Sequence, residues 1–162
     1  MLKISMFEFL IRGVPEAFLF IFAAYAFSKV KIDYKRYFIS AILLSVAACM
    51  IRFLPIQYGV NTILDISVFI ILIVNVNRIE IITSIKSVIL TIIIEYVCEG
   101  INVLIIQVIF KIDMNYIFSN SRLKAIYGIP SLIIFGIVLL FYYTSLKKRK
   151  ELRGIKNGKI EL

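Results

Sequence analysis

Apolar residues form five long runs along the chain, and short polar stretches separate them. The runs cover about residues 7–27, 37–53, 60–74, 87–109 and 125–146. A bilayer core about 30 Å thick is crossed by a helix of about 20 apolar residues, so these runs predict about five transmembrane helices. The longest run extends from residue 81 to residue 109, and Lys86 marks its interfacial end, so this span begins at about residue 87. The pattern therefore predicts an all-α integral membrane bundle over residues 1–146, followed by a basic tail at 147–162.

Composition indicates the same class of protein. Hydrophobic residues make up 61% of the 162 residues, charged residues 18%, and the mean hydropathy is +0.96. Soluble domains are only about 45–50% apolar. A formal net charge of +9 would suggest nucleic acid as a partner of a soluble protein. Here the basic residues flank apolar runs, where they contact anionic lipid, so we expect a multi-pass protein of the cell membrane with no nucleic-acid partner.

The distribution of basic residues predicts the orientation. With the tail in the cytoplasm, 13 of the 19 Lys and Arg residues lie on the cytoplasmic side. Cytoplasmic loops carry an excess of Lys and Arg, and an odd number of spans places the two termini on opposite sides. The sequence therefore predicts an outer N-terminus and a cytoplasmic C-terminus.

Several ionisable residues fall at membrane depth within these spans, namely Glu16, Asp65, Glu95 and Glu99. Each charge costs about 2.5–3.5 kcal/mol on insertion scales, so such side chains must face protein or water instead of lipid. In the fourth span the polar positions form one helical stripe at i, i+4, i+7, i+8 and i+11: Thr91, Glu95, Cys98, Glu99 and Asn102. Glu8, Arg12 and Glu16 form a second stripe with a spacing of four.

These residues predict a charge network inside the bundle. Arg12 can pair with Glu16 on its own helix, or with Glu95 or Glu99 across the bundle, and Arg52 is the other candidate cation. The candidate ligand or ion site comprises Arg12, Glu16, Arg52, Asp65, Glu95, Glu99 and Asn102. Carboxylates outnumber cations, so we expect at least one acid to hold a proton or to bind a cation. The alternative is a structural network that fixes helix register and binds nothing.

The chain contains no histidine, which removes the commonest metal ligand and the commonest general base. We therefore expect no enzymatic activity, no cofactor and no metal. Cys49 and Cys98 lie inside apolar runs, and we expect no disulfide between them.

Four stretches carry a resemblance to a known family: IRGVPEAFLF, IRFLPIQYGVNTIL, CEGINVLI and IFSNSRLKAIYGIPSLIIF. Over residues 7–146 they resemble the membrane-sensor region that precedes the kinase domain in Gram-positive sensor histidine kinases of the GHKL or sporulation type. The sequence ends at Leu162 without a phospho-accepting histidine or ATP-binding glycine boxes. The resemblance therefore implies a sensor or interaction module that acts through another membrane or cytoplasmic signalling protein, or through a homo-oligomer.

A second function remains open from the residues themselves. Glu16, Glu95 and Glu99 would line a midplane site in a small transport component that moves a proton, a cation or a small solute. A sensor and a transport component are thus the two expectations for this sequence.

The predicted orientation can be tested directly. A reporter fused after Lys150 should be active in the cytoplasm, and a cysteine introduced at Asn120 should react with a membrane-impermeant reagent added from outside. The opposite pair of results would contradict the predicted number of spans.

Overall fold

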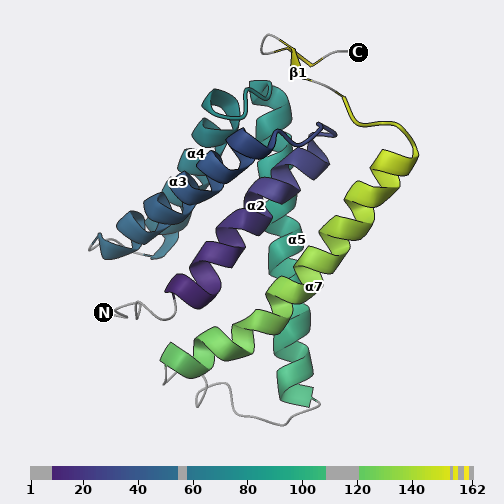
Figure 1. Cartoon of the computed structure of the whole chain (residues 1–162). Helices are drawn as coiled ribbons and strands as arrows, with labels where there is room; N and C mark the ends of the chain where they lie inside the picture. The colour runs from purple at the N-terminus through teal and green to yellow at the C-terminus, as the bar shows by residue number, and fades with distance from the viewer. Residues whose placement is uncertain (1–8, 55–57, 109–120, 154, 157–158, 161–162) are drawn as a thin grey trace.

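The computed structural model describes residues 9–54, 58–108, 121–153, 155–156 and 159–160 (Figure 1). A short π-helix and five α-helices are followed by two paired strands. Their bounds are η1 Phe9–Gly13, α2 Val14–Phe27, α3 Tyr34–Phe53, α4 Tyr58–Asn75, α5 Ile81–Val108, α7 Ser121–Lys148, β1 Ile155–Lys156 and β2 Lys159–Ile160. Glu8, the first member of the second predicted stripe, lies outside the described residues.

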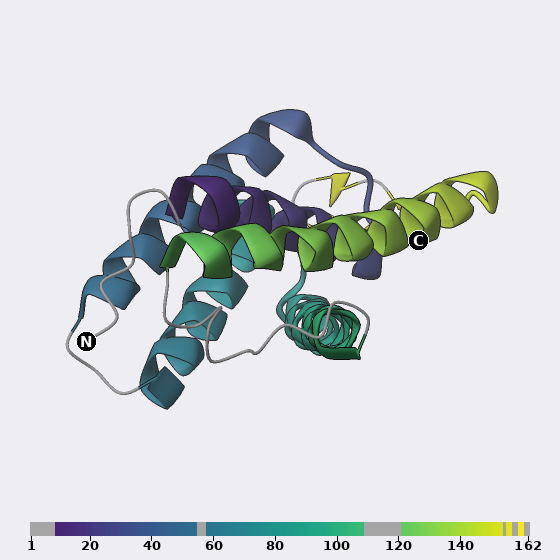
Figure 2. The same ribbon diagram turned by 90° about the horizontal axis from the view of Figure 1, so that it is seen from below.

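Helix α2 lies at the centre and packs against α3, α5 and α7, while α4 bridges α3 and α5. Figure 1 shows successive helices running in alternating directions, and Figure 2 shows α5 viewed nearly along its axis beside α2 and α7. Four described helices are long and apolar enough to cross a membrane, and α4 contributes a shorter apolar helix over Gly59–Asn75. The prediction of an all-α membrane bundle is confirmed. The orientation of its termini stays a prediction.

Large apolar side chains cover the outward faces of these helices. On α5, Ile89, Ile93 and Val97 are about half exposed, and on α7 Phe141 is 79% exposed. A monomeric soluble protein rarely exposes such continuous apolar surface. These faces suit the hydrocarbon layer of a bilayer, and the protein is therefore a multi-pass membrane protein.

Small residues on α2 allow its neighbours to approach closely. Ala17, Ala23, Ala24 and Ala26 are 0–5% exposed and belong to the buried faces of this helix. Association of helices in lipid depends on close packing of this kind, because lipid chains remove the hydrophobic driving force between helices. Two apolar clusters result, one between α2 and α3–α5 and one between α2, α5 and α7.

The start of α2 has a distinct local geometry. The wider π-helical turn of η1 ends at Gly13, and Pro15 follows in the first turn of α2. Proline is tolerated there because the first amide groups of a helix have no intrahelical acceptor. Single π turns are frequent at functional sites. This turn carries Arg12 into the bundle.

Three helix ends share one motif, and they lie at the end of the bundle opposite to η1 and the start of α2. Lys29, Arg78 and Lys150 each have a φ of 55° and follow the ends of α2, α4 and α7. Left-handed residues at this position close a helix and satisfy its last carbonyls. All three residues are basic, which also complements the negative end of the helix dipole.

The segment after α7 contacts the connection between α2 and α3. The amide of Lys31 donates to the Arg153 carbonyl at 3.0 Å, and the Arg153 amide donates to the Lys29 carbonyl at 2.8 Å. Lys29 Nζ also lies 2.7 Å from Glu151 Oε2 in an exposed ion pair. This pairing raises the pKa of Lys29 and lowers the pKa of Glu151. The end of α2 and the start of the tail are thus joined.

Candidate functional site

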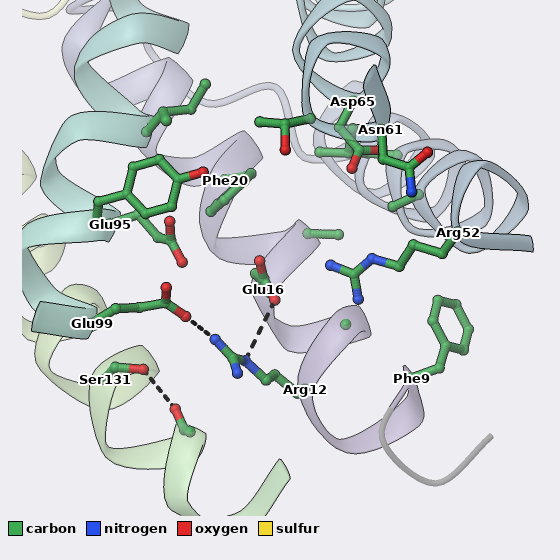
Figure 3. Close-up of a pocket in the computed structure, with 18 of the residues that line it drawn as sticks. Phe9, Arg12, Glu16, Phe20, Arg52, Asn61, Asp65, Glu95, Glu99 and Ser131 are labelled. Atoms are coloured by element: carbon green, nitrogen blue, oxygen red, sulfur yellow. Dashed lines mark hydrogen bonds and ion pairs between the residues drawn. The ribbon is translucent and has the colours of Figure 1, made fainter. Parts of the chain in front are cut away.

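A cavity of about 610 Å³ lies within the half of the bundle where α2 and α4 begin (Figure 3). Its walls come from η1, α2, the second half of α3, residues 61–69 of α4, residues 92–106 of α5 and the start of α7. Rings and aliphatic side chains make up much of the wall, including Phe9, Phe20, Phe69, Ile92 and Ile106. The cavity therefore combines an apolar surface with the charged residues described below.

Arg12 connects the first helical segment with α5. Its Nη2 forms an ion pair with Oε1 of Glu99, and its Nε lies 3.9 Å from Oε2 of Glu16 (Figure 3). The side chains of Arg12, Glu16 and Glu99 are 19%, 17% and 32% exposed. One guanidinium therefore lies between two half-buried carboxylates, and both the intrahelical and the cross-bundle partners of Arg12 are close to it.

Gly128 on α7 forms the other wall beside Arg12. A Cβ atom at this position would lie 2.9 Å from Arg12 Nη1 and 3.1 Å from Arg12 Cζ. A side chain at this position would force the guanidinium to move. The contact was missed by the sequence analysis, because a single glycine in an apolar helix gives no signal of what packs against it.

The polar stripe of α5 forms the buried face of that helix. Thr91, Glu95, Cys98 and Asn102 are 0–6% exposed, and Glu99 is half-buried beside them. Asn102 donates from Nδ2 to the Tyr127 carbonyl at 2.7 Å, which ties α5 to α7. The carboxyl group of Glu95 points into the cavity in Figure 3.

Helix α4 and the end of α3 supply the facing wall. Asp65 and Asn61 lie one turn apart on α4, and Arg52 lies in the last turn of α3. The Oδ1 atoms of Asp65 and Asn61 are shielded from solvent and accept no hydrogen bond within the described part of the chain. Arg52 forms no ion pair with any described carboxylate, and its guanidinium extends toward the interior in Figure 3.

All seven residues predicted from the sequence line this one cavity: Arg12, Glu16, Arg52, Asp65, Glu95, Glu99 and Asn102. Their role as a ligand site stays a prediction. Asn61, Phe20 and Gly128 are additional wall residues that the sequence analysis did not select. Within the described residues, no group of three or more Cys, Asp or Glu side chains is placed to hold a metal ion.

No protein-family model, curated protein or solved structure matches this chain. The fold and the cavity define a polytopic helical membrane protein with a charged internal site. Any more specific function has to be argued from the residues of that site.

The ion pair of Arg12 can be measured by a double-mutant cycle. Arg12→Gln should lower the free energy of unfolding by about 1–3 kcal/mol, because Glu99 and Glu16 then lose their cation in a half-buried position. Glu99→Gln in the Arg12→Gln background should cost less than it does alone, since the two residues interact. Equilibrium unfolding in mixed micelles measures these values. Arg78→Gln, at the opposite end of the bundle, is the control, and strictly additive effects of Arg12→Gln and Glu99→Gln would contradict the pairing.

Gly128 and Gly100 provide a matched pair of glycine substitutions. Gly128→Ala should destabilise the protein by about 1–3 kcal/mol relative to Gly100→Ala, because its methyl group displaces the Arg12 guanidinium. Gly100 has no neighbouring atom within 4 Å of an added Cβ. Replacing it by alanine improves helix propensity by up to about 1 kcal/mol. Equal unfolding free energies for the two variants would show that Arg12 does not need the space at Gly128.

Proposed function

We propose that this protein is a non-enzymatic sensor of the cell membrane, which binds a small solute in the bundle cavity and acts through a partner signalling protein. The observation that carries this proposal is the extent of the cavity along the bundle. Its wall residues extend from the end of the bundle that contains Arg12 and Glu16 to the middle of the helices, at Leu44, Phe69 and Ile92. A binding site of this form holds a solute without offering it a continuous route across the bundle.

The other half of the bundle supports the sensor proposal, because α2 packs closely against its neighbours there. In the last two turns of α2, Ala23, Ala24, Tyr25 and Ala26 are fully buried. The hydroxyl of Tyr25 donates to Asn77 Oδ1 at 2.8 Å, at the turn that connects α4 with α5. Close packing and this buried hydrogen bond favour a closed structure at this end, where Asn77 Nδ2 and Ser28 Oγ have no hydrogen-bond partner in the described part of the chain.

Helix α2 offers a physical link between the cavity and the tail. Its first turns carry Glu16 and lie beside Arg12, and the residues after its last turn contact Glu151 and Arg153. A change in the position of α2 on ligand binding would therefore reach the tail. A sensor needs such an element with a site at one end and a partner surface at the other. The resemblance to sensor-kinase membrane regions agrees with this arrangement and implies that a partner supplies the signalling output.

The partner can be sought with a photo-crosslinking amino acid at Arg149 in native membranes. We expect a partner protein to be captured there. A chain that ends at Leu146 lacks position 149, so chemical crosslinking followed by co-purification tests it, and we expect it to capture no partner while its bundle remains folded. Arg12→Gln should change the yield, because it alters the cavity end of α2. The same crosslinker at Leu140, an exposed outward position on α7, is the control for chance encounters in the membrane. A folded protein that captures nothing at Arg149 would contradict the sensor proposal.

The alternative is a small transport component, and the observation that favours it is Glu95. This carboxyl group lies at membrane depth, 6% exposed, and faces the cavity. Proton flux or solute uptake in proteoliposomes distinguishes the two functions. Flux that is abolished in the combined Glu95→Gln and Glu99→Gln variant would contradict the sensor proposal, whereas the absence of flux, or flux that survives both substitutions, would remove the transport alternative.

A further inference from the structure

Among the described residues, the buried carboxyl group of Glu95 has no hydrogen-bond donor and no cation paired with it. It is 6% exposed, and within the described residues it takes part in no hydrogen bond and no ion pair. Its carboxyl group is directed into the cavity in Figure 3. Burial of a carboxyl group without a partner is costly, so native structures normally supply a donor or a cation. The donor that suits Glu95 must come from whatever occupies the cavity.

The facing wall on α4 also contains buried acceptor atoms that lack a hydrogen-bond donor. Asp65 Oδ1 and Asn61 Oδ1 are both shielded from solvent without a hydrogen-bond donor in the described part of the chain. Both atoms are acceptors, and both residues line the cavity. Both residues line the same space as Glu95, and a rotation of their side chains would bring these acceptor oxygens to a ligand with several N–H groups.

The charge balance of the lining favours a cation. The described lining residues include four carboxylates, Glu16, Asp65, Glu95 and Glu99, and two guanidinium groups, Arg12 and Arg52. Arg12 is already shared between Glu99 and Glu16. If all six groups are ionised, the wall carries two more negative than positive charges. A positively charged occupant would reduce this excess.

The size and the apolar part of the cavity favour an organic cation over a bare metal ion. A volume of about 610 Å³ falls within the range of about 300–1,000 Å³ that is usual for small-molecule pockets. The rings of Phe20 and Phe69 stack with centroids 5.6 Å apart and contribute to the wall. Aromatic faces attract both apolar groups and ammonium or guanidinium cations. No described group of three carboxylate or thiol side chains is placed around a metal.

We infer that the ligand of this cavity is a small organic cation, an amine or a guanidine on an apolar carbon body. Its N–H groups bind Glu95 and Asp65, and its carbon body contacts Phe20 and Phe69. Arg12, held by Glu99 and Glu16, keeps the surrounding helices in place. This inference rests on the proposed function, since it names the class of solute that the sensor binds.

Phenethylamine is a suitable probe for the full chain in lipid nanodiscs. We expect it to raise the unfolding midpoint, because a ligand that binds only the folded state stabilises that state. Cys49 lines the cavity and is half-buried, whereas Cys98 is buried. Phenethylamine should therefore slow the alkylation of Cys49 by N-ethylmaleimide, with Cys98 as the internal reference. Phenethylguanidine should act in the same way.

Phenethyl alcohol is the matched neutral probe, and Na⁺ and Mg²⁺ are the inorganic ones. None of the three should protect Cys49 at the concentration at which phenethylamine does. Equal protection by phenethyl alcohol would show that the cavity selects apolar bulk and would overturn the inference. Protection by Mg²⁺ alone would overturn it in favour of a metal ion.

Substitution of the acids tests the two walls. Glu95→Gln and Asp65→Asn should each weaken phenethylamine binding by about tenfold or more, because each removes a charge-assisted hydrogen bond. Glu95→Gln should not lower the unfolding midpoint of the unliganded protein, since it replaces an unpaired buried carboxyl group by a neutral amide of similar size. Glu80→Gln, an exposed acid at the opposite end of the bundle, is the matched control. Unchanged phenethylamine binding in both cavity variants would overturn the inference.

Failure of this inference and failure of the proposed function give different results. If phenethylamine does not bind but the crosslinker at Arg149 still captures a partner, the ligand class is wrong and the sensor proposal stands. If phenethylamine binds and no partner is captured, the sensor proposal is wrong and the ligand class stands.

Discussion

The position of Arg12 constrains the rest of the bundle. A guanidinium cannot lose its charge in a protein, so at membrane depth it must lie next to carboxylates. Glu99 on α5 and Glu16 on α2 supply them. Gly128 on α7 carries no side chain and leaves the space that the cation occupies. Three helices are therefore held in one relative position by a single side chain, and the cavity beside it depends on that arrangement.

Much of the fold could be predicted because it follows from chemistry that is local in sequence. The long apolar runs indicate membrane helices, since the bilayer leaves no other way to satisfy the backbone of a lipid-exposed span. The buried face of α5 could also be predicted, because Thr91, Glu95, Cys98 and Asn102 repeat with the period of a helix within an otherwise apolar sequence. These residues do form its buried face. Periodicity thus identified which side of the helix faces protein.

Other features could not be predicted, because they depend on how separate helices are placed. The sequence left Arg12 with three possible partners, Glu16, Glu95 and Glu99. Only the relative height of α2 and α5 determines that Glu99, and not Glu95, pairs with it across the bundle. Gly128 gave no signal of its own, since its role lies in what approaches it. The contact of Arg153 with the connection after α2 uses backbone groups, which every residue has. The orientation in the membrane depends on lipid and insertion as well as on the basic residues of the chain, and it stays a prediction.

The charged residues of the cavity fall into two groups with different consequences. A network that serves only to fix helix register gains nothing from an unpaired acid, because an unsatisfied buried charge weakens the fold. Arg12, Glu16 and Glu99 fit the structural role, since each has a partner of opposite charge. Glu95 and Asp65 Oδ1 do not fit it, because neither has a hydrogen-bond donor among the described residues. The paired group maintains the shape of the cavity, and the unpaired group is the part of the wall on which the proposed binding would depend.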